Sequence, residues 1–236
     1  MAHLCVALDF AHADEAIALV RQLTPQVKWF KVGMELFNLA GPQIVEKIKG
    51  LGAEIFLDLK LHDIPQTVER TAKVLAALGV GMFNVHASGG RAMLAAARRG
   101  ADSGADENNL PRPHLLGVTV LTSLDQAALL EVGIDEPPKK QVLRLARLCK
   151  EEGLDGVVCS PLEAETLRRE LGGEFLLVTP GIRPASASLG DQKRISTPAM
   201  AVKAGADFLI VGRPITRAED PLAAAEQILA EMREEG

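Results

Sequence analysis

One stretch decides the fold of this chain: Phe56-Leu57-Asp58-Leu59-Lys60-Leu61-His62-Asp63-Ile64-Pro65. It begins as an apolar run and then places three charged residues within six positions. Because side chains two apart on a strand share a face, Asp58 and Lys60 point one way and the intervening leucine points the other. Pro65 suits the first turn of a helix, and a helical pattern continues from 66 to 78. The stretch therefore predicts a parallel strand that opens into a polar pocket and is followed by a helix.

The same three charges also fit a purely structural interpretation, which this stretch alone leaves open. Asp58 and Lys60 can form a buried ion pair, and Asp63 can be the N-cap of the helix that follows. The rest of the chain is needed to choose between a structural and a catalytic role.

The composition of the 236-residue chain limits its class. A hydrophobic fraction of 47% can supply a large core, and the length suits one α/β barrel. A net charge of −5, one Trp and no Tyr argue against a nucleic-acid partner. No apolar run approaches the roughly 20 residues of a membrane helix, and the N-terminus lacks a signal-peptide pattern. We therefore expect a cytoplasmic protein that does not engage membranes.

One unit recurs along the chain, in which a helical segment, a glycine-containing turn and a short apolar run follow one another. Apolar runs that read as strands lie at 4–8, 29–32, 55–59, 82–85, 115–121, 157–159, 175–178 and 208–211. Helical patterns lie at 13–23, 42–49, 68–78, 92–99, 139–152, 161–171, 198–204 and 221–233. Eight alternations predict an α/β fold, a single (β/α)8 TIM barrel domain spanning 1–236. An open doubly wound sheet is the alternative, but it usually has fewer strands.

Two longer segments are predicted to be loops. Residues 101–113 are polar and rich in Pro, Gly and Asn, so we expect a surface excursion there. Residues 181–195 follow the seventh expected strand and have the length of a lid. Arg183 and Gln192 are the lid residues that we expect to contact a ligand.

Polar residues gather where the expected strands end, which is the face that carries the active sites of barrels. These residues are Asp9, Lys31, Asp58, Lys60, His86, Thr122, Ser160, Arg183 and Arg213. The loops that follow strands are polar in most proteins, and this alone would account for many of these residues. It does not readily account for a lysine within the buried run Trp29-Phe30-Lys31-Val32.

A phosphate site is predicted after strands seven and eight. Gly212 would let a backbone N–H approach an anion, and Arg213 would add a fork of donors. The run Gly181-Ile182-Arg183-Pro184 supplies a second arm. Surface arginines beside a glycine turn are the alternative, but barrels frequently bind phosphate with these two loops.

Lys31, Asp58, Lys60 and Asp63 can form an array of alternating charges. Opposite charges keep the lysines protonated, so a rigid lysine can act as a general acid. A neighbouring aspartate can strain an anionic group of a substrate. The sequence contains no Walker loop, no GxGxxG and no metal-ligand histidine pair, so we expect neither a cofactor nor a metal.

The run from Asp58 to Pro65 resembles the DxKxxDIP signature of the orotidine 5′-phosphate decarboxylases, which complete UMP synthesis. DxKxxD alone also occurs in related sugar-phosphate lyases, so the specificity lies in the whole set of motifs. The likeness continues through Ala7-Leu8-Asp9, Phe30-Lys31-Val32-Gly33, Asn84-Val85-His86-Ala87, Val120-Leu121-Thr122-Ser123, Pro180-Gly181-Ile182-Arg183-Pro184 and Val211-Gly212-Arg213.

The resemblance implies decarboxylation of orotidine 5′-phosphate to UMP and CO2 without a cofactor. It implies that Lys60 protonates C6 of the pyrimidine and that Asp58 lies beside the departing carboxylate, with Lys31 and Asp63 completing the array. It also implies a homodimer with shared active sites, in which Asp63 and Thr67 reach the site of the partner subunit.

The resemblance further assigns contacts to each part of the substrate. These are Asp9 and Lys31 at the ribose hydroxyls, Thr122 near the base, Arg183, Gly212 and Arg213 at the phosphate, and Gln192 between phosphate and base.

Two other functions stay open at this point. One is a metal-dependent sugar-phosphate lyase or epimerase on the same barrel, with His86 and Asp58 near Mg²⁺; His62 is a further candidate ligand, although a strand-end histidine is more often a hydrogen-bonded anchor. The other is a non-catalytic sensor that binds UMP-like ligands.

Overall fold

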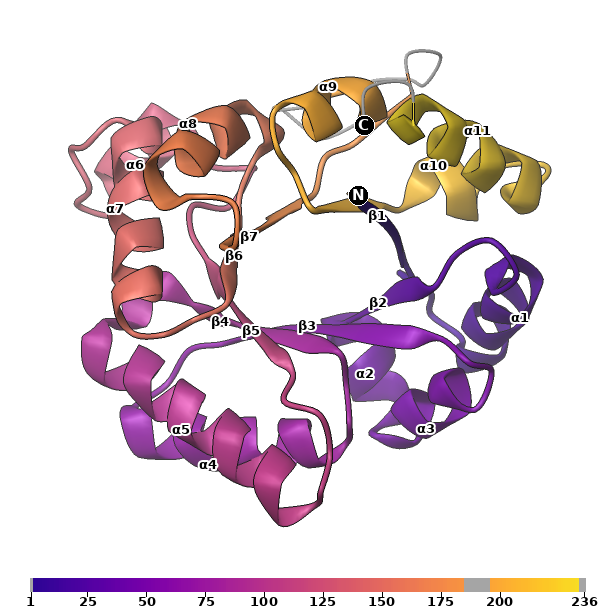
Figure 1. Ribbon diagram of the computed structural model, residues 1–236, viewed down its shortest axis with the longest axis horizontal. Coiled ribbons are helices and arrows are strands. Elements are labelled where there is room, and N and C mark those ends of the chain that lie inside the picture. The colour runs from indigo at the N-terminus through magenta and orange to yellow at the C-terminus, as the bar shows by residue number, and fades with distance from the viewer. Residues whose placement is uncertain (1, 185–195, 234–236) are drawn as a thin grey trace.

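The structure is a closed barrel of eight parallel strands surrounded by helices (Figure 1). This computed structural model describes residues 2–184 and 196–233. Neighbouring strands pair in sequence order, and the last strand closes on the first, where Cys5 lies opposite Ile210. The predicted (β/α)8 barrel is confirmed. The strands are β1 (His3–Ala7), β2 (Trp29–Gly33), β3 (Glu54–Leu61), β4 (Met82–His86), β5 (His114–Val118), β6 (Gly156–Val158), β7 (Leu176–Thr179) and β8 (Phe208–Val211).

Helices follow the strands and cover the outside of the barrel (Figure 1). Proline opens several of them, at a position whose N–H has no partner within the helix. In the part of the chain that the structure describes, no helix is long and apolar enough to span a membrane. The helices that lie at predicted positions are α1 (Ala13–Leu23), α3 (Gln43–Lys49), α4 (Pro65–Ala77), α5 (Arg91–Glu107), α7 (Pro138–Glu151), α8 (Pro161–Leu171), α9 (Pro198–Lys203) and α11 (Pro221–Arg233).

Three short helices and one 3₁₀ turn were not predicted. Two turns or fewer give only a weak helical period in the sequence, although the equally short α3 and α9 were predicted. They are α2 (Met34–Ala40), α6 (Gln126–Glu131), α10 (Arg213–Thr216) and η1 (Ala87–Gly89).

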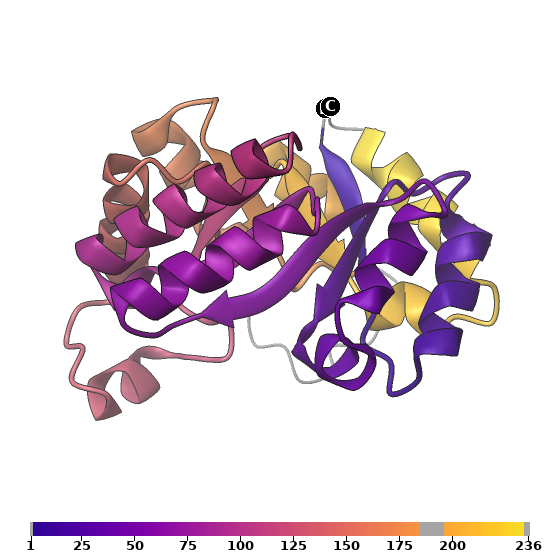
Figure 2. The ribbon, with the colours of Figure 1, turned by 90° about the horizontal axis from the view of Figure 1, so that it is seen from below.

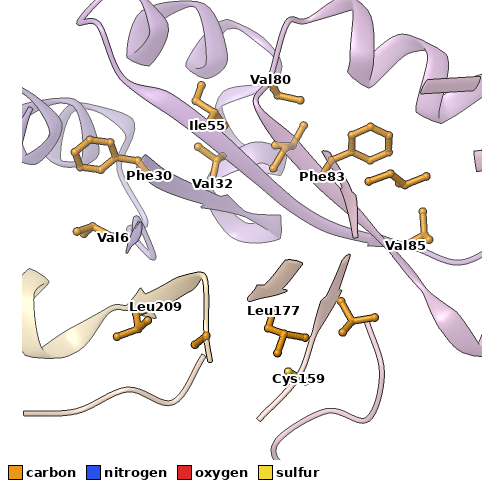
Figure 3. Close-up of a cluster of buried hydrophobic side chains, with 14 of the residues drawn as sticks. Val6, Phe30, Val32, Ile55, Val80, Phe83, Val85, Cys159, Leu177 and Leu209 are labelled. Carbon is orange, nitrogen blue, oxygen red and sulfur yellow. The ribbon is translucent and has the colours of Figure 1, made fainter. Parts of the chain in front are cut away.

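The core has two layers because successive strand residues point to opposite sides of the barrel wall. One set of buried side chains, including Phe56, Met82 and Phe208, fills the barrel interior. The larger set, including Phe30 and Phe83, packs between the strands and the helices (Figure 3). Both layers are apolar at mid-barrel, so charged side chains are left to the two ends.

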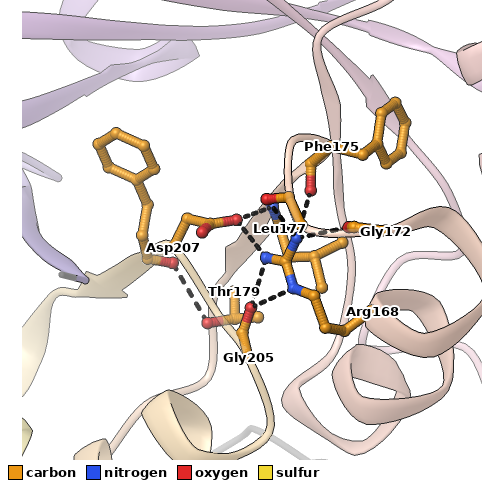
Figure 4. Close-up of polar contacts among 9 residues, drawn as sticks. Arg168, Gly172, Phe175, Leu177, Thr179, Gly205 and Asp207 are labelled. Carbon is orange, nitrogen blue, oxygen red and sulfur yellow. Dashed lines mark hydrogen bonds and ion pairs between the residues drawn. The ribbon is translucent and has the colours of Figure 1, made fainter. Parts of the chain in front are cut away.

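Arg168 joins the amino-terminal ends of β7 and β8 (Figure 4). Its guanidinium lies 2.6 Å from the Asp207 carboxylate, which also accepts a hydrogen bond from the backbone N–H of Leu177 at 2.7 Å. The remaining donors of Arg168 reach the carbonyl oxygens of Gly172, Gly173, Phe175 and Gly205.

An aspartate paired with an arginine also joins β5 to β6. Asp155, just before β6, accepts from the backbone N–H of Leu115 at 2.7 Å and pairs with Arg98 at 2.9 Å. These polar groups at the amino-terminal end bind one another and the backbone, so they hold neighbouring strands together there, whereas the active sites of barrels lie at the carboxyl end.

The prediction of a surface loop at 101–113 is wrong over the first half of that range, because α5 continues to Glu107. Helices α4 and α5 lie side by side (Figure 2) and approach closely at two glycines. A Cβ built at Gly100 would lie 2.1 Å from the backbone oxygen of Glu69, and one at Gly104 would lie 2.2 Å from that of Lys73. Over the second half of α5 the buried face therefore consists of glycine and alanine, so a polar, glycine-containing sequence did not show that the helix continues.

Replacing Gly100 with Ala is expected to lower the free energy of unfolding by about 1–3 kcal/mol, because the two helices must separate to admit the methyl group. An alanine without such a clash would instead stabilise a helix by about 0.5–1 kcal/mol. Chemical denaturation of both proteins measures the difference. Gly173→Ala, outside the helices, is the control for a glycine replacement without a clash, since a Cβ there meets nothing within 4 Å. Equal stability of Gly100→Ala and wild type would contradict the close packing.

Candidate active site

A chain of alternating charges lies at the carboxyl ends of β1, β2 and β3. Lys31 Nζ lies 3.0 Å from Asp9 Oδ1 and 3.4 Å from Asp58 Oδ2. Lys60 Nζ lies 2.7 Å from Asp58 Oδ1. The structure thus joins Asp9, Lys31, Asp58 and Lys60, three of which belong to the predicted array.

The position of Lys60 depends on an irregularity in β3. Leu57 pairs with Phe83 of β4 and Leu61 pairs with Val85, so four residue steps of β3 match two of β4. Within this bulge Lys60 has a φ of 54°, a left-handed conformation that costs a non-glycine residue roughly 1–2 kcal/mol. The bulge turns the strand end and directs the lysine toward Asp58.

Asn84 holds this irregular backbone in place. Its Oδ1 accepts from the backbone N–H of Lys60 at 2.7 Å, and its Nδ2 donates to Asp58 Oδ1 at 2.7 Å. The residue is fully buried. Asn84 belongs to the motif Asn84-Val85-His86-Ala87, but no role was predicted for it. The signal that could have found it is an amide inside the otherwise apolar run Met82-Phe83-Asn84-Val85.

The charges of this chain stabilise one another. Burial by itself would raise the pKa of the Asp58 carboxyl, but Lys31, Lys60 and the hydrogen bond from Asn84 outweigh it and lower that pKa. Burial would lower the pKa of the Lys31 ammonium, but Asp58 and Asp9 outweigh it and raise that pKa. Asp58 is therefore ionised and Lys31 protonated at neutral pH.

Asp63 and Thr67 lie apart from this charged chain and are exposed. Asp63 Oδ1 accepts from the backbone N–H of Ile64 at 2.6 Å, and among residues 2–184 and 196–233 no ion pair joins it to Lys60. Helix α4 has Ile64 as its N-cap with no side-chain cap, so the alternative role of Asp63 as the N-cap is wrong.

Two adjoining cavities open beside the charged chain. The apolar cavity, about 170 Å³, is lined mainly by apolar side chains together with Lys60 and Thr122. The cationic cavity, about 480 Å³, is lined by Arg183, Gly212 and Arg213 among others. Lys31 borders both. This arrangement suits a ligand with a flat ring at one end and an anionic group at the other.

The cationic cavity is built where two strands end. Arg183 is buried just beyond β7, whereas Arg213 is exposed in the first turn after β8. Arg217, which the sequence pattern did not single out, also lines this cavity. The predicted contact Gln192 lies outside the described residues, as does most of the expected lid at 181–195.

The two candidate metal ligands lie beside each other. The rings of His62 and His86 have their centroids 5.4 Å apart. Burial, His62 and Lys60 lower the pKa of His86, although Asp58 opposes them. Within the described parts of the chain, no group of three or more His, Cys, Asp or Glu is placed to hold a metal ion.

Comparison with known proteins gives a consistent result. The family model described as "Orotidine 5'-phosphate decarboxylase / HUMPS family" matches residues 2–228. The chain is 55% identical over 233 residues to an orotidine 5′-phosphate decarboxylase of Halorhodospira halophila, a match that covers 99% of this chain and 97% of that protein. A second relative of the same name, from Nitrosospira multiformis, is 55% identical over 218 residues, covering 92% of this chain and 88% of the relative.

Solved structures agree with these sequence matches. The crystal structure of an orotidine 5′-phosphate decarboxylase from Lactobacillus acidophilus superposes with a TM-score of 0.85 at 43% identity and covers 98% of this chain and 99% of that one. One from Pyrococcus horikoshii OT3 gives a TM-score of 0.77 at 28% identity, with 98% and 99% covered.

Proposed function

We propose that this chain, which belongs to the orotidine 5′-phosphate decarboxylase / HUMPS family and is a carboxy-lyase that converts orotidine 5′-phosphate to UMP and CO2, acts without a cofactor. In this proposal Lys60 protonates C6 of the pyrimidine. The observation that carries the proposal is Lys60, fixed 2.7 Å from Asp58 at the edge of the apolar cavity.

The chemistry requires charge stabilisation at one carbon. When the C6–carboxylate bond breaks, CO2 departs and the electron pair stays on C6, where the ring offers no conjugated electron sink. A preorganised ammonium directed at C6 stabilises this charge as it develops and then transfers its proton to the carbon. In this proposal Asp58 lies beside the carboxylate of the substrate, and two anions at close range disfavour the bound substrate relative to the transition state.

The remaining contacts orient the nucleotide. The pyrimidine occupies the apolar cavity near Thr122, and Asp9 and Lys31 meet the ribose hydroxyls. Arg183, Gly212 and Arg213 grip the phosphate in the cationic cavity. Binding energy obtained there, away from C6, holds the ring in the reactive orientation. Gln192, assigned by resemblance to a contact between phosphate and base, belongs to the same proposal.

The exposed position of Asp63 and Thr67 supports a homodimer with shared active sites. Ile64, between them, leaves 65% of its surface exposed, and Met34 after the neighbouring strand leaves 50%. Large apolar side chains beside an incomplete set of charges fit an isologous contact. We propose that Asp63 and Thr67 complete the array of the partner subunit.

The intact protein is expected to consume orotidine 5′-phosphate in buffer that contains EDTA, because no step of this mechanism uses a metal. Loss of substrate absorbance measures the reaction. A rate that disappears on chelation and returns with Mg²⁺ would favour the metal-dependent lyase or epimerase. Tight UMP binding by folded protein that turns nothing over would favour the sensor.

A further inference from the structure

We infer that Asn84 is a positioning residue for the decarboxylation, acting through both Lys60 and Asp58. This inference rests on the proposed function of Lys60. Within the described part of the chain, the amide of Asn84 is the one group that hydrogen-bonds both the backbone N–H of Lys60 and the carboxylate of Asp58, each at 2.7 Å. It does not line either cavity, so it acts on the substrate only through these two residues.

The hydrogen bonds form a closed ring. Lys60 donates its N–H to Asn84, Asn84 donates to Asp58 Oδ1, and the same oxygen accepts from Lys60 Nζ at 2.7 Å. The ring therefore begins and ends on Lys60 and fixes its backbone and its ammonium together. An amide meets the need at this position at neutral pH, since one side chain must accept from one neighbour and donate to the other.

The bulge in β3 explains why this support is needed. Between Leu57 and Leu61 the regular pairing with β4 is interrupted, and Lys60 adopts its left-handed backbone there. A buried N–H without a partner is strongly unfavourable, and Asn84 Oδ1 supplies that partner in place of a strand carbonyl. Without the amide, Lys60 is free to return to a regular strand conformation that moves Nζ away from its position beside Asp58.

Asn84→Ala removes both hydrogen bonds and is expected to lower kcat about 100-fold, the usual effect of displacing a reactive group by about 1 Å. The KM for orotidine 5′-phosphate and the affinity for UMP should change little, because the residues that line both cavities are retained. Thr179→Val in β7 is the matched control. It also removes a fully buried polar group, which donates to the backbone oxygen of Phe208 at 3.2 Å, and it should lower stability without lowering kcat.

Asn84→Asp provides the decisive second variant because it keeps the shape and the acceptor for Lys60. The introduced carboxyl faces Asp58 directly, so burial and the like charge raise its pKa. When protonated it can donate to Asp58 as the amide does, so kcat should recover as pH falls. Wild type over the same pH range is the reference, because it carries every other titratable group nearby, including Lys31, Lys60 and His86.

The outcomes distinguish a failure of the positioning role of Asn84 from a failure of the proposed function. Unchanged kcat in folded Asn84→Ala, or a pH profile of Asn84→Asp parallel to wild type, would overturn the positioning role while leaving the decarboxylase activity intact. If wild type itself showed no turnover, the proposed function would fall first, and the role of Asn84 with it.

Discussion

Lys60→Ala is expected to lower kcat by at least about 10⁴-fold, because one substitution removes both the proton donor and the charge that stabilises the carbanion. UMP affinity should be largely retained, since the cationic cavity and most of the apolar cavity stay as they are. Single-turnover measurement of UMP formation gives the rate, and calorimetry gives the affinity. The fold should tolerate the change, because Asp58 keeps its ion pair with Lys31 and its hydrogen bond from Asn84.

Two further variants identify the cause of the loss. Lys47→Ala removes an exposed lysine from α3 and should leave kcat unchanged, which controls for the loss of one positive charge from the surface. Lys60→Arg keeps a cation but replaces the ammonium with a guanidinium, which does not release its proton in proteins, so kcat should stay far below wild type. A near-normal rate in either Lys60 variant would contradict the role of this residue as proton donor.

The barrel was predictable because its signal is repeated eight times. Each strand is short and apolar, each helix follows at a regular distance, and an error in one element leaves the pattern visible. The meeting of Asp58 with Lys60 was predicted from residues alternating on a regular strand. The contact exists, but the strand is bulged at Lys60, and Asn84 from the next strand holds the bulge.

Other features depend on tertiary contacts that leave little trace in one sequence. Helix α5 was predicted too short because the buried face of its second half consists of glycine and alanine, which pack only because α4 lies against them. Asp9 joins the charged chain because β1 pairs with β2, which brings together two side chains from different strands. Asp63 follows Lys60 by three residues, yet within one chain it makes no ion pair with it among the described residues.

Because Asp63 and Lys60 make no ion pair within the described parts of one chain, we expect mixed dimers of two inactive variants to regain activity. In the proposed homodimer each site takes Lys60 from one subunit and Asp63 from the other. A dimer of one Lys60→Ala subunit and one Asp63→Ala subunit would then have one site without either residue and one site with both. Mixing two inactive proteins, unfolding them and refolding them together should restore turnover.

The expected yield is quantitative. Random pairing makes half of the dimers mixed, and one of the two sites in each mixed dimer is complete, so the mixture should reach about a quarter of wild-type activity per site. Either variant refolded alone is the control and should stay inactive. If Asp63 acted within its own chain, every mixed dimer would contain one site lacking Lys60 and one lacking Asp63, and no activity would return although the heterodimer had formed. Tagging one subunit and isolating the heterodimer distinguishes this result from a failure to pair, so the measurement decides whether the array is completed within one chain or across the interface.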